Sequence, residues 1–467
     1  MKEVFMDHVP PSPFEQIPAP EPEQADIGGI WSRHTMRNTC GELEIAGVPV
    51  SKLAADYGTP LFVLDTADAR RRARVWKHAL DAAFEQLNGA DVYYAGKAFL
   101  CKQFARWMVE EGLHIDTASY GELATALLAG VPGSACGLHG NNKSREEIEY
   151  ALECGVAHIV IDSLDELSFV EKIAAERGEV APIYLRLTTG VHAGGHQFIA
   201  TAHEDQKFGL SIATGVSREA ILQAAQADHL KLIGLHSHIG SQIAAVDGFV
   251  AAARLVLAER AWAAQCGISI DEIDLGGGYG VRYTSADPEP PLPQDFASAL
   301  AGVVTAHIEE TGLSAPRISV EPGRSIVAPA MTMLYSVGTV KNVAIDSGQR
   351  QYVAVDGGMS DNIRPALYGA DYTAALANRR SDAEYVRTRV VGKHCESGDI
   401  VVRDVSFPAD VRRGDLLAVP AVGAYGYAMT SNYNMLTKPA VVAVEQGEVT
   451  PLLRRQTVHD LLAYDVG

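Results

Sequence analysis

The feature that most constrains the fold is a regular alternation of short apolar segments and longer amphipathic segments between residues 91 and 320. The apolar segments have the length and composition of strands, and the segments between them repeat apolar residues with helical period. Eight such units over roughly 240 residues are typical of a (β/α)8 barrel, and an open doubly wound sheet is the alternative. The expected strands are Asp91–Ala95, His114–Ala118, Ala135–His139, His158–Asp162, Ile183–Thr188, Leu232–His238, Glu272–Leu275 and Arg317–Val320.

Beyond Arg324 the pattern changes to short, β-branched strands separated by Gly and Asp turns, which predicts a second, mostly β domain. One helix is expected near the end of this domain, around residues 424–434. Paired strands around residues 43–50 are expected to join it, and the Pro-rich, acidic residues 1–28 are expected to form a flexible tail. The predicted organisation is a tail at 1–28, N-terminal strands at 29–63, a barrel at 64–328 and a β domain at 329–467.

Charge and cysteine usage disfavour several classes of protein. The 467-residue chain has 39 Lys and Arg against 58 Asp and Glu, and its net charge of −19 disfavours binding to nucleic acid or to an anionic membrane. No two of its six cysteines have C-x-x-C spacing, and no apolar run is long enough to span a bilayer. Scattered cysteines and the absence of an apolar signal core predict a protein of the reducing cytoplasm.

Polar residues stand at the carboxyl end of nearly every expected strand. In a barrel these strand ends meet at one face, which is where the active site lies. Each residue alone has a structural explanation, but a ring of them at the same end is hard to assign to packing. The residues are Lys97, Asp116, His139, Asp162, Arg186, His236, His238, Gly276–Gly278, Glu321 and Arg324.

Lys97 is the one charge in the apolar stretch V-Y-Y-A-G-K-A-F-L. A lysine is almost never fully buried unless it is paired, so the simple interpretation is that its stem packs and its ammonium reaches water. The alternative is that its amine does chemistry, because burial tunes lysines into good Schiff-base formers.

The turn D-L-G-G-G-Y-G follows the seventh expected strand and is predicted to cradle a phosphate through the backbone of Gly276, Gly277 and Gly278. Its spacing does not fit a dinucleotide fingerprint, and a plain tight turn is the alternative. Ser241 and Arg324 could add a hydroxyl and a guanidinium. Glu321 either pairs with Arg324 or holds a proton on a heteroaromatic nitrogen. A reactive lysine, a phosphate cradle and such a carboxylate together indicate pyridoxal phosphate, PLP.

The pair of histidines in H-S-H suggests a metal site only weakly, because no third ligand stands at a fixed spacing. No metal is therefore expected. One of His236 and His238 is expected to stack or hydrogen-bond at the site, and plain packing is expected for the other.

Several motifs, in order, resemble a known family. They are Y-A-G-K-A-F, D-T-A-S-Y-G-E-L, H-S-H-I-G-S-Q, D-L-G-G-G-Y-G, E-P-G-R, C-E-S-G-D and G-A-Y-G-Y-A-M. The chain is similar to the barrel-type PLP decarboxylases of basic amino acids, and within them to the diaminopimelate decarboxylases, from about residue 30 to its end. The resemblance implies an alanine-racemase-like, fold-type III PLP enzyme that converts meso-2,6-diaminopimelate to L-lysine and CO2.

The resemblance also implies residue roles. Lys97 would hold the cofactor covalently, His238 would stack on its ring and Glu321 would pair with its ring nitrogen, while Cys395 would protonate the product carbanion. Asp116 and Arg186 would support these groups. The remaining cofactor-binding residues would be Ser241, Gly276, Gly277, Gly278, Arg324 and Tyr425, and the substrate-binding residues Arg324, Arg364, Tyr368, Glu396 and Tyr425. Family members are usually dimers in which the C-E-S-G-D loop reaches into the neighbouring site.

The implied substrate has a carboxylate and an ammonium at its distal end. Arg324 and Arg364 can bind the carboxylate bidentately, and Glu396 suits the ammonium. The alternatives are a decarboxylase of arginine, ornithine or a carboxylated polyamine, and a catalytically silent PLP-binding relative. One departure is V-H-A-G-G-H-Q-F where the family commonly has H-T-H, which leaves the conformation of the loop around His192–His196 open.

Overall fold

The computed structural model describes residues 29–191, 207–346 and 348–467. The predicted tail at 1–28 and the loop around His192–His196 lie outside these residues. The chain divides into two compact units. Among the described residues, a barrel unit lies within 70–281 and 289–326, and a β unit lies within 29–69, 282–288 and 327–467.

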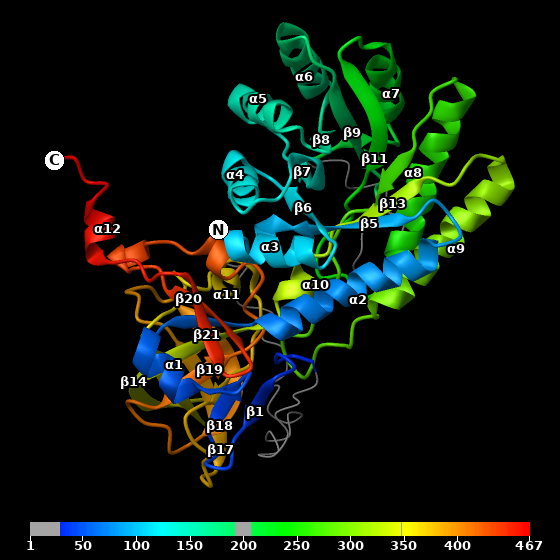
Figure 1. Cartoon of the computed structure of the whole chain (residues 1–467). Coiled ribbons are helices and arrows are strands. Elements are labelled where there is room, and N and C mark those ends of the chain that lie inside the picture. Colours follow the sequence, from blue (N-terminus) through cyan, green and yellow to red (C-terminus); the bar gives the residue numbers. More distant parts are fainter. Residues whose placement is uncertain (1–28, 192–206, 347) are drawn as a thin grey trace. The chain divides into compact units, whose positions relative to one another are not determined.

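The barrel unit is built on a closed ring of eight parallel strands (Figure 1). The ring runs β5-β6-β7-β8-β9-β11-β12-β13 and closes because β13 pairs with β5, Ser319 standing opposite Asp91. The two strands β10 (Leu210–Ser211) and β9 also pair in parallel. The ring strands are β5 (Ala90–Ala95), β6 (His114–Thr117), β7 (Cys136–Leu138), β8 (His158–Ile161), β9 (Ala181–Thr188), β11 (Leu230–His236), β12 (Glu272–Asp274) and β13 (Arg317–Val320).

Helices alternate with the ring strands and lie outside them (Figure 1). Their starts follow the capping chemistry of the sequence: Ser144 and Glu147 form a reciprocal capping box, and Ser119 and Ser163 each accept a backbone N–H three residues on. The helices are α2 (Thr66–Phe84), α3 (Lys102–Glu110), α4 (Tyr120–Leu128), α5 (Arg145–Cys154), α6 (Leu164–Arg177), α7 (Val216–Gln226), α8 (Asp247–Gln265), α9 (Pro293–Thr311) and the short α10 (Arg324–Val327), with 3-10 turns η2 (Gly96–Ala98) and η3 (Gly133–Ala135).

The predicted (β/α)8 barrel is confirmed, and the open doubly wound sheet is excluded by the closure of the ring. Each of the eight expected strands coincides with a ring strand to within a few residues. The ring strands are almost entirely buried, as parallel strands covered by helices are, and this accounts for their nearly continuous apolar character.

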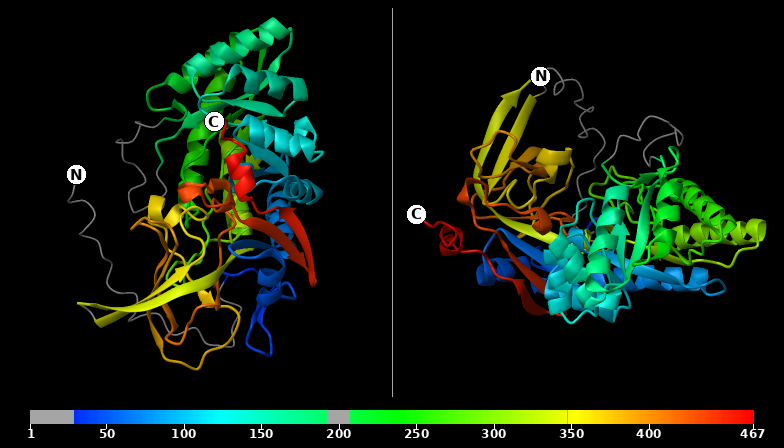
Figure 2. Two further views of the ribbon diagram at one scale, coloured as in Figure 1. Left: turned by 90° about the vertical axis from the view of Figure 1, so that its left-hand side faces the viewer. Right: turned by 90° about the horizontal axis from the view of Figure 1, so that it is seen from above.

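The β unit contains a large mixed sheet, in which a central strand β14 pairs with β15, β4 and β19. The antiparallel pair β14–β15 forms the long yellow hairpin in both views of Figure 2. The sheet strands are β4 (Leu61–Asp65), β14 (Met331–Ile345), β15 (Gly348–Val355), β16 (Ala375–Leu376), β17 (Tyr385–Val391), β18 (Ile400–Pro408), β19 (Leu416–Val419), β20 (Ala440–Glu445) and β21 (Glu448–Leu453). Three short helices belong to this unit: α1 (Val50–Tyr57), α11 (Arg364–Tyr368) and α12 (Val458–Leu462).

One expectation for the β unit needs correction. The strands around residues 43–50 belong to the β unit, as expected. They form a three-stranded sheet of their own, β1 (Thr35–Arg37), β2 (Leu43–Ile45) and β3 (Val48–Pro49), and β4 enters the large sheet. The helix expected around 424–434 is instead two 3-10 turns, η4 (Tyr427–Met429) and η5 (Tyr433–Met435). Positive φ angles of 60° at Tyr425 and 52° at Asn434 interrupt any continuous helix there.

Among the described residues, no helix combines the length and the apolarity needed to cross a bilayer. All six cysteines fall within the described ranges, and each is a free thiol.

Candidate active site

The carboxyl ends of the ring strands carry the polar residues that the sequence analysis placed there. Lys97 lies in η2, immediately after β5, and Asp116 and Arg186 lie within β6 and β9. His139 and Asp162 each follow their strand directly, and Glu321 follows β13. Because β13 and β6 both pair with β5, residues far apart in the sequence meet beside Lys97.

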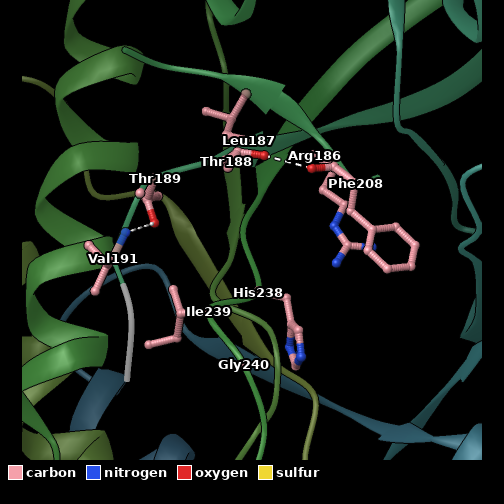
Figure 3. Close-up of a pocket in the computed structure, with 10 residues that line it drawn as sticks. Arg186, Leu187, Thr188, Thr189, Val191, Phe208, His238, Ile239 and Gly240 are labelled. Atoms are coloured by element: carbon pink, nitrogen blue, oxygen red, sulfur yellow. Dashed lines mark hydrogen bonds between the residues drawn. The ribbon is translucent and has the colours of Figure 1, made fainter. Parts of the chain in front are cut away.

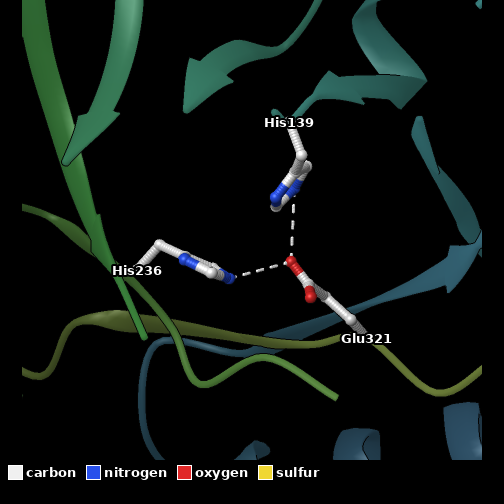
Figure 4. A group of neighbouring side chains, drawn as sticks. All are labelled: His139, His236 and Glu321. Carbon is white, nitrogen blue, oxygen red and sulfur yellow. Dashed lines mark ion pairs between the residues drawn. The ribbon is translucent and has the colours of Figure 1, made fainter. Parts of the chain in front are cut away.

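Glu321 is the centre of a buried cluster with His139 and His236 (Figure 4). Its Oε1 atom lies 3.2 Å from Nε2 of His139 and 3.2 Å from Nε2 of His236. Neither Glu321 Oε1 nor His236 Nε2 has a partner with hydrogen-bond geometry. The residue is only 3% exposed, so bulk water does not supply the missing donor.

The pKa values of Glu321 and of two neighbouring carboxyl groups, Asp116 and Asp274, are shifted in opposite directions. Burial, with the neighbouring charge of Glu321, raises the pKa values of Asp116 and Asp274 well above their usual range. Burial also opposes the charge of Glu321, but His139 and His236 outweigh it and hold the pKa of Glu321 well below its usual range. We expect Glu321 to be the ionised member and the two aspartates to keep their protons, since like charges in one site push pKa values apart.

The two histidines of H-S-H lie in different surroundings. His236 ends β11 and points at Glu321, as Figure 4 shows. His238 lies beyond the strand end, where its Nδ1 accepts the backbone N–H of Gly277 at 3.2 Å. Burial, and secondly the charge of Lys97, lowers the pKa of His238 to about 3, so its ring is neutral at physiological pH.

The three glycines after β12 form a turn whose backbone admits no side chain. An added Cβ would lie 2.5 Å from Ser237 O at Gly276, 2.3 Å from Glu321 O at Gly277 and 2.2 Å from Gly240 O at Gly278. Gly276 and Gly278 also have positive φ angles, of 69° and 111°. The turn is thus a cradle of bare backbone, in which the N–H groups of Gly276 and Gly277 donate to Asp274 Oδ1 and His238 Nδ1.

Ser241 and Arg324, the other two predicted phosphate contacts, lie next to each other. One guanidinium nitrogen of Arg324 donates to Ser241 Oγ at 2.8 Å. The Glu321 carboxylate lies 3.2 Å from the imidazoles of His139 and His236, and burial lowers the pKa values of both histidines.

A pocket of about 270 Å³ opens beside His238 (Figure 3). It is lined by the end of β9 with the residues after it, by Phe208 and by the loop after β11, and Arg186 and His238 both face it. The guanidinium carbon of Arg186 lies 4.4 Å from the ring centroid of Phe208, a cation–π contact. Asp162 Oδ1 lies 3.7 Å from Arg186, and its Oδ2 accepts the Gly209 N–H at 3.0 Å.

Two polar contacts near the strand ends were not foreseen from the sequence. The ammonium of Lys143, which is 6% exposed, donates to both oxygens of Glu166 at 3.1 Å and to Gly140 O at 2.7 Å. Glu122 accepts the Ala118 N–H at 2.7 Å, and burial raises its pKa. A charged residue within an apolar stretch would be the sequence signal for such a contact. Neither D-T-A-S-Y-G-E-L nor N-N-K-S (residues 141–144) places its charge in an apolar stretch.

The β unit carries the remaining candidate residues. Arg364 begins α11 and is 6% exposed; it donates to the hydroxyl of Tyr372, and its guanidinium carbon lies 4.7 Å from the ring centroid of Tyr283. Tyr368 ends the same helix and is 65% exposed. Aromatic rings therefore hold the guanidinium of Arg364 in one orientation.

Cys395 and Glu396 lie in the loop between β17 and β18, and both are exposed. The backbone N–H of Cys395 donates to Asn434 Oδ1 at 3.2 Å, and Glu396 Oε1 accepts the Gly398 N–H at 3.2 Å. Tyr425 stands before η4 with a positive φ of 60°, an uncommon conformation for a bulky residue.

Comparisons with known proteins agree with this arrangement. Residues 66–328 match the family described as "Pyridoxal-dependent decarboxylase, pyridoxal binding domain". A curated diaminopimelate decarboxylase of Mycobacterium tuberculosis is 51% identical over 443 residues, which cover 94% of this chain and 98% of that protein. The chain belongs to the diaminopimelate decarboxylase family. A Bacillus subtilis member of the family is 44% identical over 92% of this chain and 96% of its own.

Solved structures of the family share the fold. The diaminopimelate decarboxylase of M. jannaschii superposes with a TM-score of 0.87 at 30% identity, covering 93% of this chain and 98% of its own. The Helicobacter pylori enzyme, solved in complex with L-lysine, gives a TM-score of 0.78 at 29% identity over 89% of this chain and 98% of its own. These matches confirm the resemblance drawn from the motifs, the fold-type III architecture and the PLP cofactor.

The barrel residues fit PLP on structural grounds of their own. The cofactor has an aldehyde, a phosphate and a ring nitrogen, and the strand ends offer a lysine, a glycine cradle and a buried carboxylate. The partnerless Oε1 atom of Glu321 is the kind of acceptor that a ring N–H would satisfy.

Proposed function

We propose that the protein decarboxylates meso-2,6-diaminopimelate to L-lysine and CO2, with PLP held by Lys97. The observation that carries the chemistry is Glu321, a buried carboxyl group whose pKa is held well below its usual range and whose Oε1 atom has no hydrogen-bond partner among the described residues. Near-full-length relatives of 41–51% identity named diaminopimelate decarboxylase support this substrate over other basic amino acids.

PLP, when bound, supplies an electron sink for the pair of electrons that the departing CO2 leaves behind. Glu321 keeps the ring nitrogen protonated, because an anion in a buried site favours the protonated partner. His238, neutral and fixed by Gly277, packs against the ring, and the backbone of Gly276–Gly278 with Ser241 and Arg324 holds the phosphate.

Substrate selection and proton return fall to the β unit in this proposal. Arg364 binds the distal carboxylate and Glu396 the distal ammonium, while Tyr368 and Tyr425 enclose the substrate. The bond from the α-carbon to its carboxyl carbon breaks, CO2 leaves, and the Cys395 thiol gives its proton to that α-carbon. The resulting thiolate regains a proton from solvent, so the overall reaction consumes one proton. The rigid holding of Arg364 by Tyr283 and Tyr372 supports its part.

The proposal extends to a cytoplasmic homodimer whose subunits share their active sites. Six free cysteines support a reducing compartment. Light scattering on the purified protein would give a dimer mass, and a monomer that is fully active would overturn the shared-site part.

The deciding experiment adds PLP and then meso-diaminopimelate to the purified protein, and follows cofactor absorbance, CO2 and L-lysine. We expect an absorbance band from Lys97-bound cofactor, followed by CO2 and lysine in equal amounts. Lys97→Ala should lose both signals, whereas Lys102→Ala, which changes an exposed lysine on α3, should keep them. A band with CO2 only from arginine or ornithine would favour the alternative decarboxylase, and no CO2 from any amino acid would favour the silent relative.

A further inference from the structure

Asp399 lies at the end of the loop that carries Cys395 and Glu396, immediately before β18. It is 3% exposed, which is rare for a carboxylate unless donors compensate for the lost water. Its Oδ2 atom accepts the backbone N–H of His394 at 2.8 Å and lies 2.9 Å from the Nδ1 atom of the same residue. Because a carboxylate accepts, that imidazole nitrogen is the donor.

The other oxygen of Asp399 reaches a different segment. Its Oδ1 atom accepts the backbone N–H of Met359 at 2.7 Å. Met359 belongs to the stretch Gly357–Ile363 that leads directly into α11 and so to Arg364. A backbone bond from Lys393 N–H to Gly357 O at 2.9 Å joins the same two segments.

Two glycines make room for this carboxylate. A Cβ added at Gly392 would lie 2.1 Å from Oδ2 of Asp399, and one at Gly358 would lie 2.4 Å from Oδ1. Gly358 also has a φ of 150°, outside the range that other residues readily adopt. The backbone of both segments therefore approaches Asp399 more closely than any residue with a side chain would permit.

Further contacts fix the loop on the side of Cys395. The ring of His394 stacks on Tyr433 with centroids 5.5 Å apart and planes 5° apart. The next residue, Cys395, donates its N–H to Asn434 Oδ1. Thus Asp399 holds His394, His394 holds Tyr433, and the Cys395 backbone is fixed between them.

We propose that Asp399 is a positioning residue for the decarboxylation: it joins the Cys395 loop to the segment leading into Arg364, and so sets both proton delivery and distal-carboxylate binding. The inference rests on the proposed function, because it assigns Asp399 a part through Cys395 and Arg364. In the Asp399→Asn variant one oxygen can still accept from Met359, but an amide NH2 then faces the two N–H donors of His394. We expect the Cys395 loop to be released.

The test is a double-mutant cycle read on kcat and KM of the PLP-loaded full chain. Asp399→Asn should lower kcat about 10-fold or more and raise KM for diaminopimelate, with the cofactor absorbance unchanged. If Asp399 acts through Cys395, adding Asp399→Asn to Cys395→Ser should lower kcat little further, because the loop then presents no acid. A purely structural role would multiply the two losses.

Asp415→Asn is the matched control, because Asp415 is also 3% exposed in the β unit but binds Arg379 and the N–H of Arg412. Its kcat effect should be small and should multiply with that of Cys395→Ser. His394→Gln, which removes one donor to Asp399, serves if Asp399→Asn does not fold, and should show the same non-additivity. An unchanged kcat in the folded Asp399 or His394 variant, or a multiplicative double variant, overturns the inference. An inactive wild-type protein would instead overturn the proposed function.

Discussion

Glu321 of the barrel unit and the pair Cys395 and Glu396 of the β unit differ in how they are exposed to solvent. Glu321 lies at the end of a ring strand and is 3% exposed. Cys395 and Glu396 lie on a loop and are exposed. A carboxylate that tunes a buried cofactor needs burial on a rigid strand, whereas a group that exchanges protons with solvent needs an exposed loop that a few contacts hold. Arg364, the candidate for substrate selection in the β unit, is buried like Glu321.

Removing the charge of Glu321 is the strongest challenge to the barrel side of this comparison. A buried hydrogen bond to a charged group is worth about 3 kcal/mol, so Glu321→Gln should lower kcat by about 100-fold or more while Lys97 still binds PLP. Steady-state CO2 release and the absorbance of the cofactor check this. Glu310→Gln, on the exposed face of α9, should leave kcat unchanged. A full rate in Glu321→Gln would remove the carboxylate from the mechanism.

Cys395→Ser tests the loop side. General acid catalysis contributes typically 10²–10⁴-fold, so kcat should fall by about 100-fold with KM and PLP binding little changed. Single-turnover kinetics would place the loss after CO2 release. Cys266→Ser, another exposed thiol, is the control and should remain at the wild-type rate. If kcat survives in Cys395→Ser, another group supplies the proton.

Arg364→Lys asks whether the β unit selects the substrate. A lysine cannot form the bidentate contact, so KM for diaminopimelate should rise about 10-fold, equivalent to about 1.4 kcal/mol. Turnover of ornithine, which has no distal carboxylate, should not change by that factor. Arg403→Lys, at an exposed position of β18, controls for the loss of a guanidinium. Equal effects on both substrates would contradict distal-carboxylate binding by Arg364.

The smallest expected effect concerns the pH dependence of the free energy of unfolding, to which a buried histidine of the barrel unit contributes. Burial lowers the pKa of His158, inside the barrel, to about 3 from its ordinary 6.5. As the pH falls, His158 therefore takes up a proton in the unfolded chain before it does so in the folded chain. Its contribution to the free energy of unfolding is complete above about pH 6.5 and is lost as the pH falls toward 3. His158→Gln should flatten the fall of the unfolding free energy between pH 7 and 5 by up to about 1.4 kcal/mol per pH unit.

Denaturant titrations of the cofactor-free protein would measure that slope. His78→Gln, which changes an exposed histidine on α2, should retain the wild-type slope. An unchanged slope in His158→Gln would show that this ring does not titrate with unfolding.

The sequence was sufficient to place the barrel residues, because strand ends follow from local hydrophobic pattern and a closed ring brings them to one face. Lys97 and Glu321 could be placed at strand ends in this way. The contacts of Glu321 with His139 and His236 could not, because they join strands separated by many residues and depend on side-chain direction. The β unit was less predictable still. Its mistaken helix at 424–434 contains Tyr425 and Asn434 in left-handed conformations that no local propensity signals.

The closure of the ring has a consequence for how the protein acquires its cofactor. Lys97 follows the first ring strand and Glu321 the last, and they become neighbours only when β13 pairs with β5. A chain in which β13 has not yet paired with β5 has Lys97 in place without Glu321 beside it. Because the two groups meet only in the closed ring, we expect PLP to bind that form better than an open one and to shift the folding equilibrium toward closure. The change in cofactor fluorescence during refolding would therefore report the rate at which β13 pairs with β5 and closes the ring.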